Sequence, residues 1–171
     1  MISISKFSGC GLALGAVSFA ALTLQVLPAF AATTLCDSGK MLATNWEVNV
    51  SDIGPEGVSA GDLRYAAGEL FAENGDKIAS VFVRREVLPG GSLVTEMDHV
   101  FADGDLFVRS IEMVDRTPLS TEKITSPALN LGITGGTGAY RNLTGHGVYR
   151  LVGADDIASA RYEVEFEIDC E

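Results

Sequence analysis

Apolar and polar residues alternate along the end of the chain. Tyr162, Val164, Phe166 and Ile168 share one parity, and the residues between them are glutamates. A period of two is that of a β-strand with one buried and one hydrated face. The same pattern predicts seven more short strands, and no helix of useful length is visible after residue 31. The predicted strands cover residues 41–51, 62–72, 77–88, 92–101, 106–114, 128–134, 145–152 and 160–169.

Turn-forming residues separate these segments. Asn74-Gly75 lies between two apolar runs and is typical of a tight hairpin. Pro89-Gly90-Gly91, Asp103-Gly104 and Ala154-Asp155-Asp156 mark further reversals, and the polar segment 115–127 is expected to be a surface loop. Short strands joined mainly by tight turns predict an all-β fold, an eight-stranded antiparallel β-barrel, whose closure removes exposed sheet edges. The interior of such a barrel is filled by side chains or holds one small ligand.

The first 31 residues have the pattern of an export signal. Lys6 precedes an apolar stretch of small residues, and Ala29-Phe30-Ala31 fits the small-x-small rule for cleavage. A single membrane-spanning anchor is the alternative, although the apolar stretch is near the lower length limit for a span. We expect residues 1–31 to be a signal peptide, residues 32–171 to be the barrel domain, and the protein to be secreted or periplasmic.

Cleavage after Ala31 would remove Cys10 and leave two cysteines. Cys36 would lie near the new N-terminus, and Cys170 is the penultimate residue. In an oxidising compartment such a pair predicts a disulfide that joins the chain ends. Two unrelated buried thiols are the alternative. A disulfide here would make the first and last strands neighbours, as a closed barrel requires.

The balance of charge limits the expected partners. The formal net charge is −11 and the pI is about 4.5, with the acidic residues scattered along the chain. Nucleic-acid binding needs a basic surface, and so does adsorption on anionic lipid. We therefore expect neither nucleic acid nor a membrane as a partner after cleavage of the signal.

A glycine-rich string spans residues 132–138 and reads Gly-Ile-Thr-Gly-Gly-Thr-Gly. A nucleotide-binding turn of similar composition requires a parallel strand before it and a helix after it. Here Asn142, Gly145 and Gly147 follow, and a helix would not tolerate them. The string therefore predicts a tight corner between two barrel strands and no nucleotide cofactor.

Extended to Ala139-Tyr140 and followed by Gly145 and Gly147, the same string resembles a segment shared by allene oxide cyclases and dirigent proteins. Segments 46–49 and 61–68 resemble the first two strands of the cyclases. The resemblance implies an eight-stranded antiparallel barrel, a cavity that needs no cofactor, and a homo-oligomer, trimer or dimer. It implies ring closure of a fatty-acid allene oxide for the cyclases themselves.

The resemblance also implies site residues. Glu47 and Asn49 match a cavity glutamate and a water-holding asparagine of the cyclases, and both are expected to be catalytic. Asn45, Pro55 and Tyr65 are expected to bind ligand, although Gly54 stands where the cyclases have serine before the proline. Leu70 stands where they have a cavity cysteine.

The alternation around Glu47 allows two interpretations. Asn45, Glu47 and Asn49 share one parity of the strand, and Trp46 has the other. If the polar parity faces inward, burial would raise the pKa of Glu47 and make it a candidate acid or base. Alternatively Trp46 and its neighbours of like parity fill the core, and Glu47 faces water.

Histidine and cysteine give no metal site. The chain has His99 and His146, and neither has acidic or cysteine neighbours at ligand spacing. We therefore expect no metal. His146, between two glycines near a predicted barrel rim, could line a cavity mouth, and it is also consistent with an ordinary surface position.

Three functions fit these observations. The first is a cofactor-independent barrel that binds a small apolar molecule and guides its cyclisation, isomerisation or coupling, as an isomerase of cyclase type would. The second is a non-catalytic carrier that resembles lipocalins in role. The third is a solid barrel that acts through the 115–127 loop.

Overall fold

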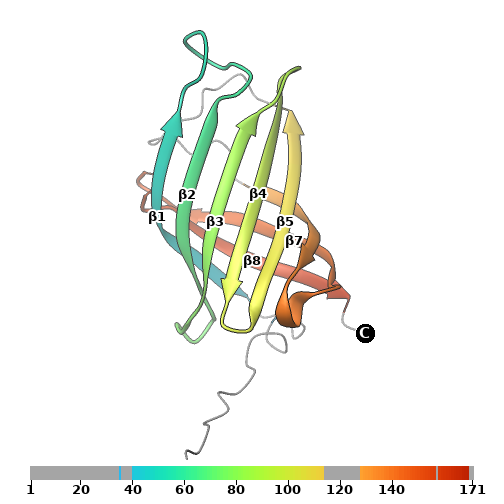
Figure 1. Cartoon of the computed structure of the whole chain (residues 1–171). Coiled ribbons are helices and arrows are strands. Elements are labelled where there is room, and N and C mark those ends of the chain that lie inside the picture. The colour runs from blue at the N-terminus through green and yellow to red at the C-terminus, as the bar shows by residue number, and fades with distance from the viewer. Residues whose placement is uncertain (1–34, 36–39, 114–127, 157, 170–171) are drawn as a thin grey trace, which may run out of the picture.

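The computed structural model describes Leu35 and residues 40–113, 128–156 and 158–169. Eight antiparallel strands form a closed barrel, each paired with its neighbours in sequence and the last with the first (Figure 1). In Figure 1 the near wall is β1 to β5, and β7 and β8 cross behind it at an angle. The elements are β1 Met41–Ser51, β2 Leu63–Phe71, β3 Lys77–Val87, β4 Ser92–Phe101, β5 Gly104–Met113, β6 Ala128–Gly136, the 3-10 turn η1 Gly138–Tyr140, β7 Thr144–Gly153 and β8 Arg161–Asp169.

The predicted fold class is confirmed. The strands over 41–51 and 92–101 have the predicted bounds, and each of the other strands differs from prediction by one or two residues at one or both ends. The segment 1–31, Cys36, Cys170 and the loop 115–127 lie outside the described residues, so the signal, the disulfide and the loop stay predictions. Within the described part of the chain, no helix has the length and apolarity needed to cross a bilayer.

A bulge in β1 changes which side chains face inward. Met41 and Ala43 are buried, but the pairing of β1 with β2 shifts between Thr44 and Glu47. Asn45 occupies the bulge with a φ of 59°, and its amide donates to Glu69 at 2.6 Å. One extra residue reverses the alternation beyond it. The inward parity is therefore odd before Asn45 and even after it.

The two ends of the barrel interior differ in the side chains that fill them. One end holds a dense aromatic cluster, in which the Phe101 and Tyr140 rings stack with centroids 4.7 Å apart. His99 stacks near Phe101 with ring centroids 6.5 Å apart, and Phe166 packs edge-on against His99 at 5.4 Å. Toward the other end, where β1 leads into β2, the interior becomes polar.

Gly68 on β2 makes room for Trp46. A Cβ at this position would lie 2.5 Å from Cε3 of the indole. The indole also packs edge-on against Tyr162, with ring centroids 6.1 Å apart. The missing side chain of Gly68 therefore lets the chain's only tryptophan lie flat against the barrel wall.

Candidate functional site: the polar end of the barrel interior

A cavity of about 40 Å³ lies inside the barrel at its polar end. Its walls combine aromatic, aliphatic and cationic side chains from seven strands. They are Trp46, Val48, Arg64, Ala66, Val83, Arg85, Met97, Leu129, Tyr149 and Tyr162. Ligand pockets measure roughly 300–1,000 Å³. A ligand of ordinary size would therefore enter by displacing the long, unbranched side chains of Met97 and the arginines.

Strand register places a row of polar side chains across one wall of the interior. Arg64 on β2 pairs directly with Arg85 on β3, Arg85 with Thr95 on β4, and Thr95 with Ser110 on β5. All four residues are buried. Nε of Arg85 donates to Oγ1 of Thr95 at 2.9 Å, and Nη2 lies 3.7 Å from a carboxylate oxygen of Glu112.

Burial shifts the ionisation of these groups. Loss of hydration, together with repulsion from Arg85, lowers the pKa of Arg64 to about 10. Desolvation likewise lowers the pKa of Arg85, against the opposing attraction of Glu112. Burial raises the pKa of Tyr162, while both guanidinium groups act in the opposite direction. Both arginines carry positive charge at neutral pH.

A histidine and a tyrosine form a buried pair beside the cavity. His99 is completely enclosed, and desolvation lowers its pKa to about 4, so the imidazole is neutral at pH 7. Nδ1 lies 3.3 Å from the carbonyl oxygen of Leu106. A carbonyl can only accept, so Nδ1 carries the proton and Nε2 accepts a short hydrogen bond from the Tyr149 hydroxyl. Burial also raises the pKa of Tyr149.

The expected catalytic pair lies on the outer face of β1. Glu47 and Asn49 are exposed, whereas Trp46 is 8% exposed and lies in the core. Because the bulge at Asn45 reverses the alternation, the aromatic parity points inward. The structure therefore supports the second interpretation of this strand, in which Trp46 fills the core and Glu47 faces water. A catalytic role for Glu47 and Asn49 stays a prediction, without the interior position that motivated it.

The other expected ligand-binding residues are also exposed. Tyr65 pairs with Asn49 across the outer face of β1 and β2, and Asn45 contacts Glu69. Pro55 lies in the loop between these strands, and Nε2 of His146 on β7 lies 3.3 Å from Glu167. The structure thus brings Asn49 and Tyr65 together but places none of these side chains at the interior cavity.

Sequence reasoning missed the interior polar residues, although one signal for them was present. In the strand 77–88, the apolar residues Ala79, Val81, Val83 and Val87 share one parity, and Arg85 has this parity as well. Arg64 has the parity of Leu70 on β2 in the same way. A charged residue on the apolar parity of a strand indicates a polar group inside the barrel. His99 shares the parity of Met97 and Phe101 in the strand 92–101 in the same way. Its pairing with Tyr149 could not be predicted, because it joins strands far apart in sequence.

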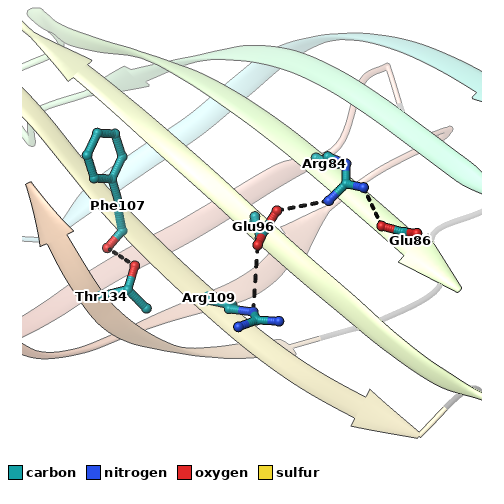
Figure 2. Close-up of polar contacts among 6 residues, drawn as sticks. All are labelled: Arg84, Glu86, Glu96, Phe107, Arg109 and Thr134. Carbon is teal, nitrogen blue, oxygen red and sulfur yellow. Dashed lines mark hydrogen bonds and ion pairs between the residues drawn. The ribbon is translucent and has the colours of Figure 1, made fainter. Parts of the chain in front are cut away.

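A larger groove of about 480 Å³ crosses the outer face of β2 to β6. Its arginines pair with neighbouring glutamates (Figure 2). Arg84 contacts Glu86 and Glu96, and Arg109 lies 3.7 Å from Glu96. These ion pairs are partly exposed, so each contributes little free energy. Both hollows are partly open to water, and we favour the cavity inside the barrel as the site of chemistry because Arg64, Arg85 and Tyr149 in its wall are buried.

Within the described part of the chain, no group of three or more histidine, cysteine, aspartate or glutamate side chains is arranged to hold a metal ion. The polar groups of the cavity are guanidinium, indole and phenol groups. These groups can donate hydrogen bonds to a ligand, and the guanidinium groups can bind a negatively charged group. The phenols can also relay a proton.

Comparison with known proteins identifies the class of fold. A pyocyanin demethylase is 22% identical, with a TM-score of 0.56 over 76% of this chain and 98% of its own. A pterocarpan synthase dirigent protein is 14% identical, with a TM-score of 0.54 over 75% of this chain and 84% of its own. The Diels-Alderase AbmU from Streptomyces koyangensis is 11% identical, with a TM-score of 0.57 over 78% of this chain and 64% of its own. No family model and no curated protein matches the sequence.

At these identities the likeness shows the fold. The chain shares a closed eight-stranded barrel with proteins described as dirigent proteins and Diels-Alderases. This agrees with the dirigent part of the sequence resemblance. Membership of the allene oxide cyclase family stays a prediction.

Proposed function

We propose that the protein binds a small apolar molecule inside the barrel and guides its cyclisation, isomerisation or coupling without a cofactor. The observation that carries this proposal is that Tyr149, which forms part of the wall of an aromatic cavity, is hydrogen-bonded through its hydroxyl to the buried His99. A binding site that holds a flexible substrate in reactive conformations supplies a large part of catalysis in such reactions. The barrel fold shared with dirigent proteins and Diels-Alderases supports the same class of reaction.

The pair supplies a route for one proton. The Tyr149 hydroxyl donates to Nε2 of His99, so its oxygen lone pairs remain free to accept from a bound molecule. When a ligand O–H or N–H gives its proton to the Tyr149 oxygen, the phenolic proton passes to Nε2, leaving a ligand anion and an imidazolium. Reversal at another ligand atom completes an isomerisation with no net change in protons.

A carrier without turnover is the second candidate. The small volume of the cavity favours it, because a cavity of about 40 Å³ does not present a preformed substrate shape. In that case the aromatic walls and the Tyr149 hydroxyl would bind the small molecule without catalysing its conversion. The two functions share the site and differ in what Tyr149 does.

The first experiment identifies what the barrel holds. The protein would be purified from its host and examined by native mass spectrometry for a co-purifying small molecule. Trp46 lines the cavity and is the chain's only tryptophan, so quenching of its fluorescence reports binding of candidate molecules. If nothing co-purifies and no apolar molecule quenches Trp46, the barrel is not a binding site and the solid-barrel hypothesis stands.

The second experiment separates turnover from carriage. With the identified molecule, Tyr149→Phe keeps the ring and removes only the hydroxyl. We expect turnover to fall by about 10²-fold or more, as for loss of a positioned proton-transfer group, with little change in Trp46 quenching. Unchanged product formation in this variant would contradict the relay. Glu47→Gln is measured alongside, because loss of turnover there would instead support the outward pair Glu47 and Asn49.

Secretion and self-association stay predictions. Tyr65, Phe82 and Ile111 expose apolar surface on the outer wall, as a homodimer or homotrimer would require. Light scattering coupled to size-exclusion chromatography measures the mass directly. N-terminal sequencing of protein from the host tests cleavage after Ala31.

A further inference from the structure

The indole nitrogen of Trp46 is a buried hydrogen-bond donor without an acceptor. Only 8% of the residue is exposed, and its Nε1 forms no hydrogen bond with the described part of the chain. An indole N–H can donate but cannot accept, and in buried tryptophans it usually has a partner. A donor that loses water on folding and gains no acceptor lowers the stability of the fold. The placement of Nε1 therefore needs an explanation other than packing.

Trp46 differs from the other residues with such atoms because it belongs to the wall of the interior cavity. Among the described side chains, Asp98, Asp103 and Tyr140 also have buried polar atoms without a partner, and none of the three lines this cavity. The cavity measures about 40 Å³, and one water molecule needs roughly 10–15 Å³. A group that carries an oxygen atom therefore fits into it without displacing a side chain.

Packing limits the movement of the indole. A Cβ on Gly68 would lie 2.5 Å from Cε3 of the ring, so the β2 backbone approaches the ring closely at that atom. Tyr162 contacts the indole edge-on, with ring centroids 6.1 Å apart. The face of an aromatic ring can accept an N–H, but this interaction is much weaker than a hydrogen bond to oxygen. The contact with Tyr162 thus holds the ring in place and does not replace an oxygen acceptor.

We propose that the indole N–H of Trp46 binds a carbonyl oxygen of the molecule held in the barrel. The inference rests on the proposed function and narrows its substrate class to apolar or aromatic carbonyl compounds. A carbonyl oxygen is an uncharged acceptor, and it matches the single uncharged donor of the indole. A donor at this oxygen also stabilises the negative charge that develops there, and so assists the loss of a ligand proton to Tyr149.

The first test observes the indole N–H directly by NMR. The chain has one tryptophan, so the full-length protein labelled with ¹⁵N in its tryptophan gives a single ring N–H signal. The probes are acetophenone and α-methylstyrene, which have the same shape and differ only in C=O against C=CH₂. We expect acetophenone to move the indole proton downfield, as a hydrogen bond to oxygen does, and α-methylstyrene to cause no downfield shift.

The second test removes the N–H and keeps the shape of the ring. A tryptophan-auxotrophic expression host can replace Trp46 alone with its benzothiophene analogue, in which sulfur stands in place of N–H. Isothermal titration calorimetry measures the dissociation constants of both probes for the native and the replaced protein. We expect the preference for acetophenone over α-methylstyrene to fall about fivefold, the ratio that one neutral hydrogen bond provides. Circular dichroism establishes whether the replaced protein is folded, and the NMR test decides if it is not.

Phe82→Ser is the matched control for where the probes bind. The Phe82 side chain is exposed and lines the outer groove, so this variant removes an aromatic surface outside the barrel. It should leave the downfield shift and the preference for acetophenone unchanged. Loss of both in Phe82→Ser would place the probes in the groove and overturn the inference.

The other outcomes overturn the inference in distinguishable ways. If both probes bind but acetophenone gives no downfield shift, or its preference survives in the benzothiophene protein, the barrel binds apolar molecules and the indole holds no ligand oxygen. If the indole proton already lies downfield without a probe and neither probe moves it, a buried water is the acceptor. A co-purified molecule without a carbonyl would exclude this substrate class and leave the proposed function intact. If neither probe binds and no molecule co-purifies, the proposed function fails together with the inference.

Discussion

The enclosed imidazole of His99 makes the stability of the protein sensitive to mild acid. In the folded chain its pKa is lowered from 6.5 to about 4 by desolvation. Between these values the unfolded chain binds a proton and the folded chain does not, so stability is fully present above pH 6.5 and falls as the pH drops to 4. The loss should reach roughly 3 kcal/mol, at about 1.4 kcal/mol per pKa unit. Urea unfolding followed by Trp46 fluorescence from pH 7 to pH 4 measures it.

Two variants identify the group responsible for this acid limb. His99→Gln should be less stable at pH 7, because it loses the ring packing and the acceptor for Tyr149, and its stability should be nearly flat over the same window. His146→Gln should keep the wild-type slope, since the His146 side chain is 57% exposed and lies outside the core. An acid limb that survives in His99→Gln would assign the pH dependence to another group.

Gly68 sets the position of the indole at the cavity. Gly68→Ala would place a Cβ 2.5 Å from the Trp46 ring, and the ring must move or the strand must shift. We expect a loss of about 1–3 kcal/mol in the free energy of unfolding and a shift in the Trp46 emission maximum. Gly132→Ala is the matched substitution, because its nearest atom is the Arg109 carbonyl oxygen at 3.9 Å. Equal stabilities in the two variants would contradict the close packing of Trp46 on Gly68.

At the residue scale, the sequence predicted apolar and polar faces better than it predicted the site. Trp46 and Glu47 are neighbours on β1, so one of them must face the core and the other water. The alternation of the strand allowed both arrangements. The bulge at Asn45 decides which of the two parities faces inward. The sequence of the 41–51 segment does not predict this bulge. The resemblance to the cyclases favoured Glu47, whereas the charged residues inside the barrel are Arg64 and Arg85.

At the element scale, the corner after β6 depends on a close approach of two backbones. Gly138 has a φ of +52°, and a Cβ there would lie 2.0 Å from the Asp103 carbonyl oxygen in the β4–β5 turn. The amide of Ala139 donates to the same Asp103 carbonyl oxygen at 3.1 Å. The glycine-rich string thus ties η1 to a neighbouring hairpin, which is the structural role that its sequence context predicted.

Replacing Gly138 should lower the free energy of unfolding by more than backbone strain alone explains. Gly75 in the β2–β3 turn has a φ of +87°, and a Cβ there would meet nothing within 4 Å. Both Gly138→Ala and Gly75→Ala pay for a strained backbone, but only the first collides with Asp103. We expect Gly138→Ala to lose about 2 kcal/mol more than Gly75→Ala in urea unfolding. Similar losses of stability in the two variants would mean that η1 and the β4–β5 turn can move apart without cost.

The order of the strands was predictable because each turn is local. Asn74-Gly75 and Pro89-Gly90-Gly91 each join segments of clear alternation, and a meander leaves few other arrangements. The strand ends were harder to predict, since pairing with a neighbour extends a strand beyond its own pattern. Gly135 and Gly136 belong to β6 because they pair with Phe107 and Leu106, although neither glycine has a side chain to show an alternation.

At the scale of the whole molecule, the barrel closes over a short seam. Among the described residues, β1 and β8 pair at Met41–Val164, Leu42–Glu163 and Ala43–Tyr162, whereas β4 and β5 pair along their full lengths. Lys40 supplements the seam with a contact to Glu163 at 3.0 Å, but this pair is exposed and contributes little. A covalent link near this seam would hold together the place where the barrel has fewest strand contacts.

The predicted disulfide between Cys36 and Cys170 would provide that link. The register of the seam is antiparallel, and β8 runs on past Val164 toward the end from which the chain enters β1. The cysteines themselves lie outside the described residues. Closing a loop of this length should stabilise the protein by about 4–5 kcal/mol on the chain-entropy model. Cys36→Ser and Cys170→Ser should each lose about that much and become insensitive to dithiothreitol, whereas Cys10→Ser should match the wild type. If unreduced, denatured protein without the segment 1–31 reacts with a thiol reagent at both cysteines, the barrel is closed by its strand pairing alone.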